Sequence, residues 1–360
     1  MQALVLAGGE GTRLRPLTYT TPKPVMPLAG RPFLSFMLDW ARGNGVDEVV
    51  LSCGFLSDAV RRVLGDIYDG MRLRYVVEEE PLGTAGPVRL AYDEGLLDDR
   101  LLVLNGDVLT DVDLTAELRQ HEQTGANVTL ALYPVEETSA YGVVPTDEQG
   151  RVEAFLEKTD DPPTNRINAG AYVLERDVVA ERIPAGRPVS FEREVFPALV
   201  GDGLYGYLAA GYWIDIGTPA RYLEATWDLL AGYPPSSLPA RDETGSLVYQ
   251  GCLVSGAHIG PQTVLGRSCS VGTDARVERS VLHDRVVVGA DAAVLESVLA
   301  QRVRVGERAR IEPSAVLGAG AVIGPGAVVG EGARLDPGTR VEPGTSIEPG
   351  SKVEPAERVP

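Results

Sequence analysis

The sequence GAGAVIGPGAVVGEGARL, residues 318–335, repeats one pattern every six residues: an aliphatic side chain followed by small residues and turn formers. The aliphatic position recurs without a break at Val305, Ile311, Leu317, Ile323, Val329, Leu335, Val341, Ile347, Val353 and Val359. An α-helix has no six-residue period, and a plain strand has a period of two. The spacing instead predicts a parallel β-helix with triangular coils, in which each side contributes one inward aliphatic side chain.

The same ladder extends toward the N-terminus. The six-residue step is kept by Ile259, Leu265, Val271 and Val277, and the register then slips by one residue twice, through Leu282, Val288, Val294 and Leu299. A disordered Gly/Pro-rich tail would not keep so regular a ladder. Because such a core is built by stacking coils, many repeats are needed. The pattern resembles the left-handed hexapeptide β-helix, and we expect that fold over residues 251–360.

A change of composition separates the repeat from the rest of the chain. Residues 233–250 begin with a stretch rich in Pro, Ser and Gly, which is typical of a linker. Residues 1–232 alternate apolar strands, such as QALVL (2–6) and RLLVLNGD (100–107), with helix-length segments. This order predicts an α/β, Rossmann-like domain with a mainly parallel mixed sheet, in which ligands bind at the carboxyl ends of the strands.

Charge and composition argue against several classes of function. The 360 residues include 33 lysines and arginines against 51 acidic residues, a net charge of −18. Such a surface repels phosphate backbones, so we expect no nucleic-acid partner. No apolar run could span a bilayer and no signal peptide is evident, so we expect no membrane contact and a cytoplasmic location. The three cysteines, Cys53, Cys252 and Cys269, lack metal-ligand spacing and are expected to be reduced.

A glycine-rich loop with cationic residues behind it follows the first strand. The segment reads Leu6-Ala7-Gly8-Gly9-Glu10-Gly11-Thr12-Arg13-Leu14-Arg15-Pro16-Leu17, with Pro22-Lys23-Pro24 beyond it. Glycines at this position let backbone N–H groups approach phosphate oxygens, and Arg13 and Lys23 supply cationic donors. The glycines alone could equally form a tight turn, and their spacing matches neither the dinucleotide-binding nor the P-loop pattern.

The whole string resembles the signature of the sugar-phosphate nucleotidylyltransferases. Further motifs follow in the family's order: EEEPLGTAG (78–86), NGD (105–107), YGVV (141–144), FLEK (155–158), INAG (167–170) and WIDIGTP (213–219). The resemblance implies Mg²⁺-dependent transfer of a nucleotidyl group from a nucleoside triphosphate to a sugar 1-phosphate. EEEPLGTAG and NGD resemble the GDP-mannose pyrophosphorylase branch, which implies GTP and mannose 1-phosphate as partners. Thr159 departs from the family, since many relatives have proline there.

The resemblance also implies roles for individual residues. Nucleotide binding would fall to Leu6, Gly8, Gly9, Gly11, Thr12, Arg13, Lys23, Glu78, Pro81, Gly83, Thr84, Ala85, Gly106 and Asp107. Sugar-phosphate binding would fall to Gly142, Glu157, Lys158, Asn168 and Asp215. The catalytic set would be Arg13, Lys23, Asp107, Lys158 and Asp215, with Asp107 and Asp215 as the Mg²⁺ ligands. The carboxylate of Glu78 would match the adjacent N1–H and N2–H donors of guanine.

Plainer interpretations of these residues, and other functions, stay open. Asp107 could cap a helix, and Glu157-Lys158 could form a solvated turn. A thymidylyltransferase using dTTP and glucose 1-phosphate is the nearest alternative. An acyltransferase working through the β-helix would need either His258 or His283 as a general base. A catalytically silent regulatory homologue would not need the complete set of charged residues assigned to catalysis above. The open end and flat faces of the coils favour self-association, so we expect a homo-oligomer.

Overall fold

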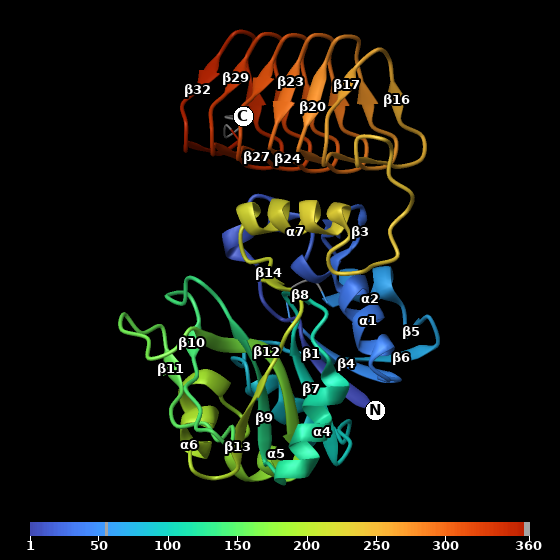
Figure 1. Ribbon diagram of the computed structural model, residues 1–360. Helices are drawn as coiled ribbons and strands as arrows, with labels where there is room; N and C mark the ends of the chain where they lie inside the picture. The colour runs from blue at the N-terminus through green and yellow to red at the C-terminus, as the bar shows by residue number, and fades with distance from the viewer. Residues whose placement is uncertain (55–56, 356–360) are drawn as a thin grey trace. The chain divides into compact units, whose positions relative to one another are not determined.

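The computed structural model describes residues 1–54 and 57–355, and Figure 1 shows its helices and strands. The chain divides into two compact units: the first comprises Met1–Gly9 and Leu34–Trp213, and the second comprises Glu10–Phe33 and the chain from Ile214 onward. The glycine-rich loop is therefore split between the units after Gly9. The domain boundaries expected near residues 232 and 250 stay a prediction.

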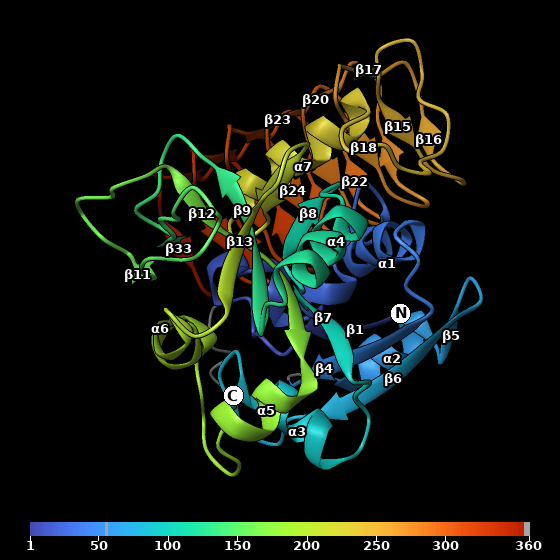
Figure 2. The same ribbon diagram turned by 60° about the horizontal axis from the view of Figure 1, so that its bottom comes forward.

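A ten-stranded mixed sheet forms the centre of the first unit, with the path β11-β10-β12-β7-β1-β4-β6-β5 and with β9 and β13 joined beside β12. The parallel strands at its centre are β7 (Arg100–Asn105), β1 (Gln2–Leu6), β4 (Glu48–Cys53) and β6 (Met71–Val77), which Figure 2 shows side by side. The other strands are β5 (Ile67–Tyr68), β9 (Val128–Pro134), β10 (Gly142–Val143), β11 (Leu156–Glu157), β12 (Arg166–Glu175) and β13 (Leu204–Leu208). The Rossmann-like domain with a mixed sheet is confirmed.

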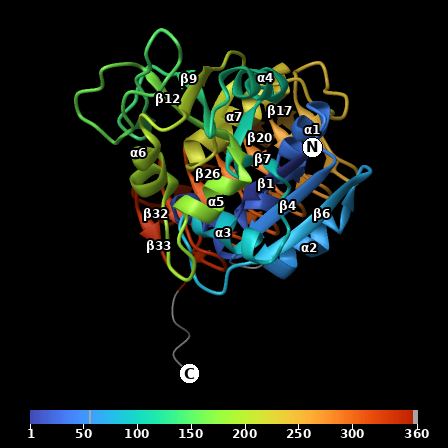
Figure 3. The ribbon, with the colours of Figure 1, turned by 90° about the horizontal axis from the view of Figure 1, so that it is seen from below.

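Helices cover the sheet, as the continuous apolar runs of its central strands require. They are α1 (Phe33–Gly43), α2 (Ser57–Leu64), α3 (Gly86–Asp93), α4 (Leu114–Thr124), α5 (Arg176–Arg182), η4 (Phe191–Val195) and α6 (Phe196–Leu199). The side chain of Asp113 accepts a hydrogen bond from the backbone of Ala116 at the start of α4, a normal N-cap. Figure 3 shows α3 and α5 side by side, joined by Arg89, which donates to the carbonyl of Ile183 at 2.7 Å.

The repeat of the second unit forms three parallel sheets of two- and three-residue strands. One contains β15 (Leu247–Val248), β18 (Val264–Leu265), β21 (Val281–Leu282), β24 (Val298–Leu299), β27 (Val316–Leu317), β30 (Arg334–Leu335) and β33 (Lys352–Val353). The second contains β16 (Leu253–Val254), β19 (Ser270–Val271), β22 (Val287–Val288), β25 (Arg304–Val305), β28 (Val322–Ile323) and β31 (Arg340–Val341). The third contains β17 (His258–Ile259), β20 (Arg276–Glu278), β23 (Ala293–Leu295), β26 (Arg310–Ile311), β29 (Val328–Val329) and β32 (Ser346–Ile347).

The three sheets confirm a parallel β-helix, while its left-handedness stays a prediction. Leu265 pairs with Leu282, seventeen positions later, and Leu299 pairs with Leu317, eighteen positions later. The one-residue slips in the sequence ladder therefore shorten whole coils and leave the inward side chains stacked. Val359, the last predicted rung, lies outside the described residues.

Two kinds of glycine explain the composition of the repeat. Gly326 has a φ of +68°, a left-handed corner conformation that other residues adopt at a cost. At Gly324 a Cβ would lie 2.5 Å from the backbone nitrogen of Pro343 in the next coil. Glycine is therefore needed both to turn the coil and to let neighbouring coils approach closely.

The rest of the second unit packs on the coils. It contains η1 (Thr12–Leu14), η2 (Leu17–Tyr19), η3 (Lys23–Val25), β2 (Pro27–Leu28), β3 (Arg31–Pro32) and α7 (Pro219–Ala231). Tyr249 of the first coil donates to the carbonyl of Ala29 at 2.8 Å. Arg334 donates to the carbonyl of Arg13 at 3.3 Å. Residues 10–33 are thus held by side chains of the β-helix.

The short strands β8 (Val108–Thr110) and β14 (Trp213–Asp215) complete the description. Among residues 1–54 and 57–355, the structure has no helix with both the length and the apolar character needed to cross a bilayer.

Candidate active site

The carboxyl ends of β1 and β7 bring together residues from two distant motifs. The backbone N–H of Gly106 donates to the carbonyl of Leu6 at 2.9 Å. A Cβ at Gly106 would overlap that carbonyl, so only glycine lets the two strand ends come this close. The structure therefore places Leu6, Gly106 and Asp107 at the same edge of the first unit's sheet, where parallel strands bind ligands.

Glu78 lies against the glycine loop at this edge. Its carboxylate accepts a hydrogen bond from the Ser52 hydroxyl at 2.6 Å and one from the backbone N–H of Leu82 at 3.0 Å. A Cβ at Gly8 would lie 2.5 Å from Oε1 of Glu78. The structure thus joins two predicted nucleotide-binding residues, Gly8 and Glu78, and adds Ser52, which the sequence motifs do not include.

The loop from Pro81 to Ala85 is fixed by a segment more than a hundred residues later. Gly83 has a φ of +79°, and a Cβ there would lie 2.5 Å from the carbonyl oxygen of Val189. Thr84 donates to Oε2 of Glu192 at 2.6 Å and accepts from the backbone of Phe191 at 2.8 Å. Glu192 therefore holds the loop from Pro81 to Ala85 in place, and no local sequence pattern marks Glu192.

A buried tyrosine connects the NGD and INAG motifs. Nδ2 of Asn168 donates to the Tyr172 hydroxyl at 2.9 Å, and that hydroxyl donates to Oδ1 of Asn105 at 3.4 Å. Burial, and then the charge of Glu192, raise the pKa of Tyr172 well above its usual value. The hydroxyl therefore keeps its proton, and the predicted sugar-binding Asn168 is tied to the strand end that carries Asp107.

Gly142 and Glu157 face each other on the short pair β10–β11, and Lys158 directly follows β11. A Cβ at Gly142 would lie 2.7 Å from the Phe155 ring. Lys158 has a φ of +53°, which is uncommon for a residue other than glycine and is often found at functional sites. Its side chain is 58% exposed, and its ammonium lies 3.8 Å from the carboxylate of Glu157. At this separation a surface ion pair contributes little stability.

The remaining predicted residues belong to the second unit. Thr18 donates to the carbonyl of Gly11 at 2.8 Å, and Thr12 and Arg13 form η1 just beyond Gly11. A Cβ at Gly217 would lie 2.7 Å from Nη2 of Arg13 and 2.8 Å from Oδ2 of Asp215. Arg13 and Asp215 are therefore brought close to one glycine. Lys23 is only 8% exposed, which is unusual for lysine.

The proposed metal ligands Asp107 and Asp215 belong to different units. That both bind the same Mg²⁺ therefore stays a prediction. Carboxylate oxygens are the donors that Mg²⁺ prefers, and one or two of them suffice when substrate phosphates and water supply the others. The donor chemistry therefore fits. Within the described part of the chain, no cluster of three or more His, Cys, Asp or Glu side chains could hold a metal by itself.

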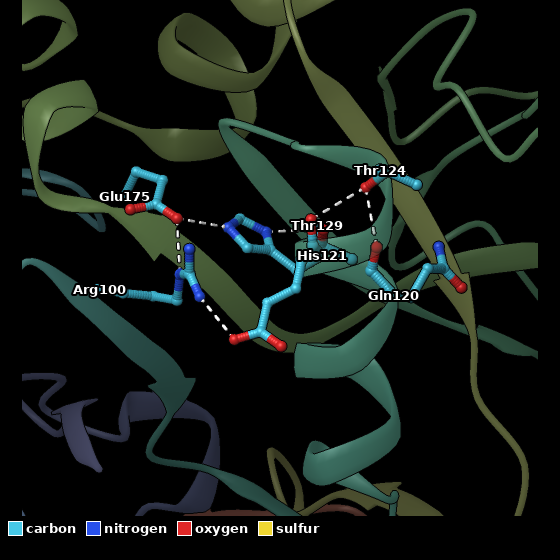
Figure 4. Close-up of polar contacts among 7 residues, drawn as sticks. Arg100, Gln120, His121, Thr124, Thr129 and Glu175 are labelled. Carbon is cyan, nitrogen blue, oxygen red and sulfur yellow. Dashed lines mark hydrogen bonds and ion pairs between the residues drawn. The ribbon is translucent and has the colours of Figure 1, made fainter.

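A second polar cluster lies at the other end of β7, where Arg100 begins the strand (Figure 4). Arg100 donates to Oε1 of Glu175 at 2.6 Å, and Nε2 of His121 lies 3.0 Å from the same oxygen. Nδ1 of His121 lies 2.9 Å from the Thr129 hydroxyl. Burial lowers the pKa of His121 below its usual value. This histidine is a packed, hydrogen-bonded residue of α4, and its partner Glu175 binds Arg100 at the start of β7, whereas Asp107 follows the end of that strand.

The two histidines of the β-helix have different surroundings. His258 is 66% exposed and lies 3.1 Å from Glu278. His283 is buried, and its Nε2 lies 3.0 Å from the Tyr222 hydroxyl. His283 therefore has a partner within the packed interior, which does not favour the acyltransferase alternative.

The nucleotidyl transferase family matches residues 2–232, and the GMPPB C-terminal domain matches residues 250–329. The mannose-1-phosphate guanylyltransferase of Mycobacterium tuberculosis is 45% identical over 291 residues, which cover 79% of this chain and 80% of that protein. Mannose-1-phosphate guanylyltransferase 1 of Arabidopsis thaliana is 36% identical over 337 residues, covering 88% and 91%.

Among solved structures, HddC from Yersinia pseudotuberculosis is similar with a TM-score of 0.53 and 27% identity, covering 62% of this chain and 97% of that chain. The same protein complexed with GMP-PN matches with the same TM-score and 26% identity. A family match over more than half of the chain, together with relatives this similar over most of its length, shows that the chain belongs to the nucleotidyl transferase family.

Proposed function

We propose that the protein transfers a guanylyl group from GTP to mannose 1-phosphate, giving GDP-mannose and pyrophosphate in a Mg²⁺-dependent reaction. The observation that carries this proposal is the 45% identity, over about four fifths of both chains, to a relative named mannose-1-phosphate guanylyltransferase. Relatives with the same activity in their names come from a plant and a fungus as well as a bacterium.

In this proposal a phosphate oxygen of the sugar phosphate attacks the α-phosphorus of GTP in line, and pyrophosphate leaves. Such a reaction needs positioning and charge neutralisation rather than a protein nucleophile. Asp107 and Asp215 would hold Mg²⁺, which would neutralise phosphate charge. Arg13 and Lys23 would hold the triphosphate by charge-assisted hydrogen bonds as pyrophosphate departs.

The sugar side of the proposed site consists of Gly142, Glu157, Lys158 and Asn168. The ammonium of Lys158 would bind the sugar phosphate, and the carboxylate of Glu157 would accept hydrogen bonds from sugar hydroxyls. The fixed position of Asn168 beside Tyr172 supports its use as a sugar contact, because preorganised hydrogen-bonding groups bind without a further ordering cost.

The substrate test is a matrix of nucleoside triphosphates against several sugar 1-phosphates, measured by pyrophosphate release. Preference for GTP with mannose 1-phosphate is expected. A preference for dTTP with glucose 1-phosphate would replace our proposal by the thymidylyltransferase alternative.

The site test uses Asp107→Asn and Asp215→Asn. Each is expected to abolish turnover and to leave the thermal melt nearly unchanged, because the amide keeps the shape but loses the charge. Asp99→Asn is the matched control, since Asp99 precedes the amino end of β7 and its side chain is 87% exposed. Full activity in both test variants would refute the assignment.

The proposal includes a homo-oligomer associated through the β-helix and a cytoplasmic location. Leu253, Val254 and Val287 are 67%, 41% and 40% exposed on strands of the same sheet, and such a group of aliphatic side chains supports a contact surface. A clean monomer mass in light scattering would reject the oligomer.

A further inference from the structure

The carboxylate of Glu78 is held from two directions by residues of its own unit. Oε1 accepts from the Ser52 hydroxyl at 2.6 Å, and Oε2 accepts from the backbone N–H of Leu82 at 3.0 Å. The backbone of Glu78 is fixed as well, since its N–H donates to the carbonyl of Cys53 at 2.9 Å. Only the side-chain torsions of Glu78 can then vary, and the hydrogen bonds from Ser52 and Leu82 restrict them.

Ser52 also supports the glycine loop. It is fully buried near the end of β4, and its carbonyl accepts from the N–H of Ala7 at 2.9 Å. The adjacent Gly8 has no room for a Cβ because Oε1 of Glu78 fills that space. One serine therefore links the backbone that begins the loop to the carboxylate packed against it.

We propose that Ser52 is a positioning residue that sets the plane of the Glu78 carboxylate and thereby the selectivity for guanine. The inference rests on the proposed function. The terminal rotation of a glutamate is broad and roughly two-fold, so a carboxylate without lateral hydrogen bonds samples many planes. Accepting N1–H and N2–H of guanine together requires one plane, because hydrogen bonds weaken steeply when misaligned. The carboxylate has about four acceptor positions, so two internal donors leave acceptor capacity for the base.

The test compares GTP with inosine triphosphate, which lacks the N2 amine. Ser52→Ala removes the hydroxyl and is expected to lower the ratio of kcat/KM for GTP to that for inosine triphosphate roughly tenfold, the equivalent of one hydrogen bond. The change is expected in KM for GTP, while KM for mannose 1-phosphate stays unaltered. Ser52→Thr keeps a hydroxyl and is expected to retain the wild-type ratio.

Glu78→Gln tells whether Ser52 acts through Glu78. In that background, adding Ser52→Ala is expected to change the ratio no further, because the carboxylate that Ser52 orients is gone. If Ser52→Ala does not fold, Ser52→Cys decides the question, since a thiol has nearly the same shape but is a weak donor.

Three results would overturn the inference: a folded Ser52→Ala or Ser52→Cys variant with the wild-type ratio, an equal loss of selectivity with and without the Glu78 carboxylate, or a wild-type enzyme that uses GTP and inosine triphosphate equally well. Failure of the proposed function is distinguishable, because it would show as a wild-type enzyme that prefers another base, such as thymine, over guanine.

Discussion

Lowering the pH from 7 to 5 is expected to destabilise the second unit through one buried histidine, His283. The Tyr222 hydroxyl donates to the carbonyl of Pro27, so Nε2 of His283, 3.0 Å away, must be the donor to the tyrosine oxygen. Burial lowers the pKa of His283 from 6.5 to about 4, and the charge of Asp284 acts in the opposite direction.

The size and sign of the effect follow from these two pKa values. Below pH 6.5 the unfolded chain takes up a proton at His283 that the folded chain refuses until about pH 4. The free energy of unfolding therefore falls as the pH falls through this window, by up to about 1.4 kcal/mol per pH unit. Between pH 7 and pH 5 the contribution amounts to a loss of roughly 2 kcal/mol.

The assay compares chemical denaturation of the wild type and of His283→Gln at both pH values. Glutamine retains an N–H donor and does not titrate, so the variant should lose roughly 2 kcal/mol less on acidification. Trp227 reports the second unit, because its indole donates to the carbonyl of Arg279 at 3.1 Å; Trp40 and Trp213 are replaced by phenylalanine throughout. His258→Gln, at an exposed histidine of the same coils, is the matched control. Identical pH dependence in His283→Gln and the wild type would refute the reasoning.

Two further predictions concern the first unit. Glu117 is completely buried. Burial raises its pKa well above 4.5, and a backbone contact with Ala131 acts in the opposite direction. Above pH 4.5 the unfolded chain releases a proton from Glu117 that the folded chain keeps, so the free energy of unfolding falls as the pH rises. Chemical denaturation at pH 5 and pH 8 should therefore show that Glu117→Gln becomes more stable relative to the wild type at the higher pH. The same stability difference between the two proteins at both pH values would contradict this prediction. Gly106→Ala should lower the free energy of unfolding by roughly 1–3 kcal/mol, because the added methyl group would overlap the carbonyl of Leu6. It should also lower kcat, because the backbone shift would displace the neighbouring Asp107. An unchanged kcat in a folded variant would be evidence against a catalytic role for Asp107.

The β-helix could be predicted because each coil repeats the same local requirement. Leu317, Ile323 and Val329 are all buried rungs of one ladder, and their spacing is visible in any short window of the sequence. The one-residue slips in the six-residue spacing could not be explained from the sequence. The pairing of Leu265 with Leu282 shows that they correspond to coils of seventeen residues.

The candidate site could be predicted only in part, because some of its residues act through contacts that do not repeat locally in the sequence. Gly8, Glu78 and Asp107 belong to recognisable motifs, whereas Ser52, Tyr172 and Glu192 act through single tertiary hydrogen bonds. A serine near the end of an apolar strand has no periodic partner in the sequence. Its importance depends on which side chain another strand brings beside it, and that information is not local.

The assignment of residues 10–33 to the same compact unit as the coils has a practical consequence for anyone shortening this chain. A fragment ending near residue 232 would keep the lysine and arginine proposed to bind the triphosphate. It would leave Ala29, Tyr222 and Arg13 without their partners Tyr249, His283 and Arg334. The repeat therefore cannot be removed without affecting residues 10–33, which belong to the same compact unit. Its side chains fix the backbone of residues 10–33. Exchanging it for another protein's repeat is therefore expected to lower the affinity for the nucleotide that this segment is proposed to bind.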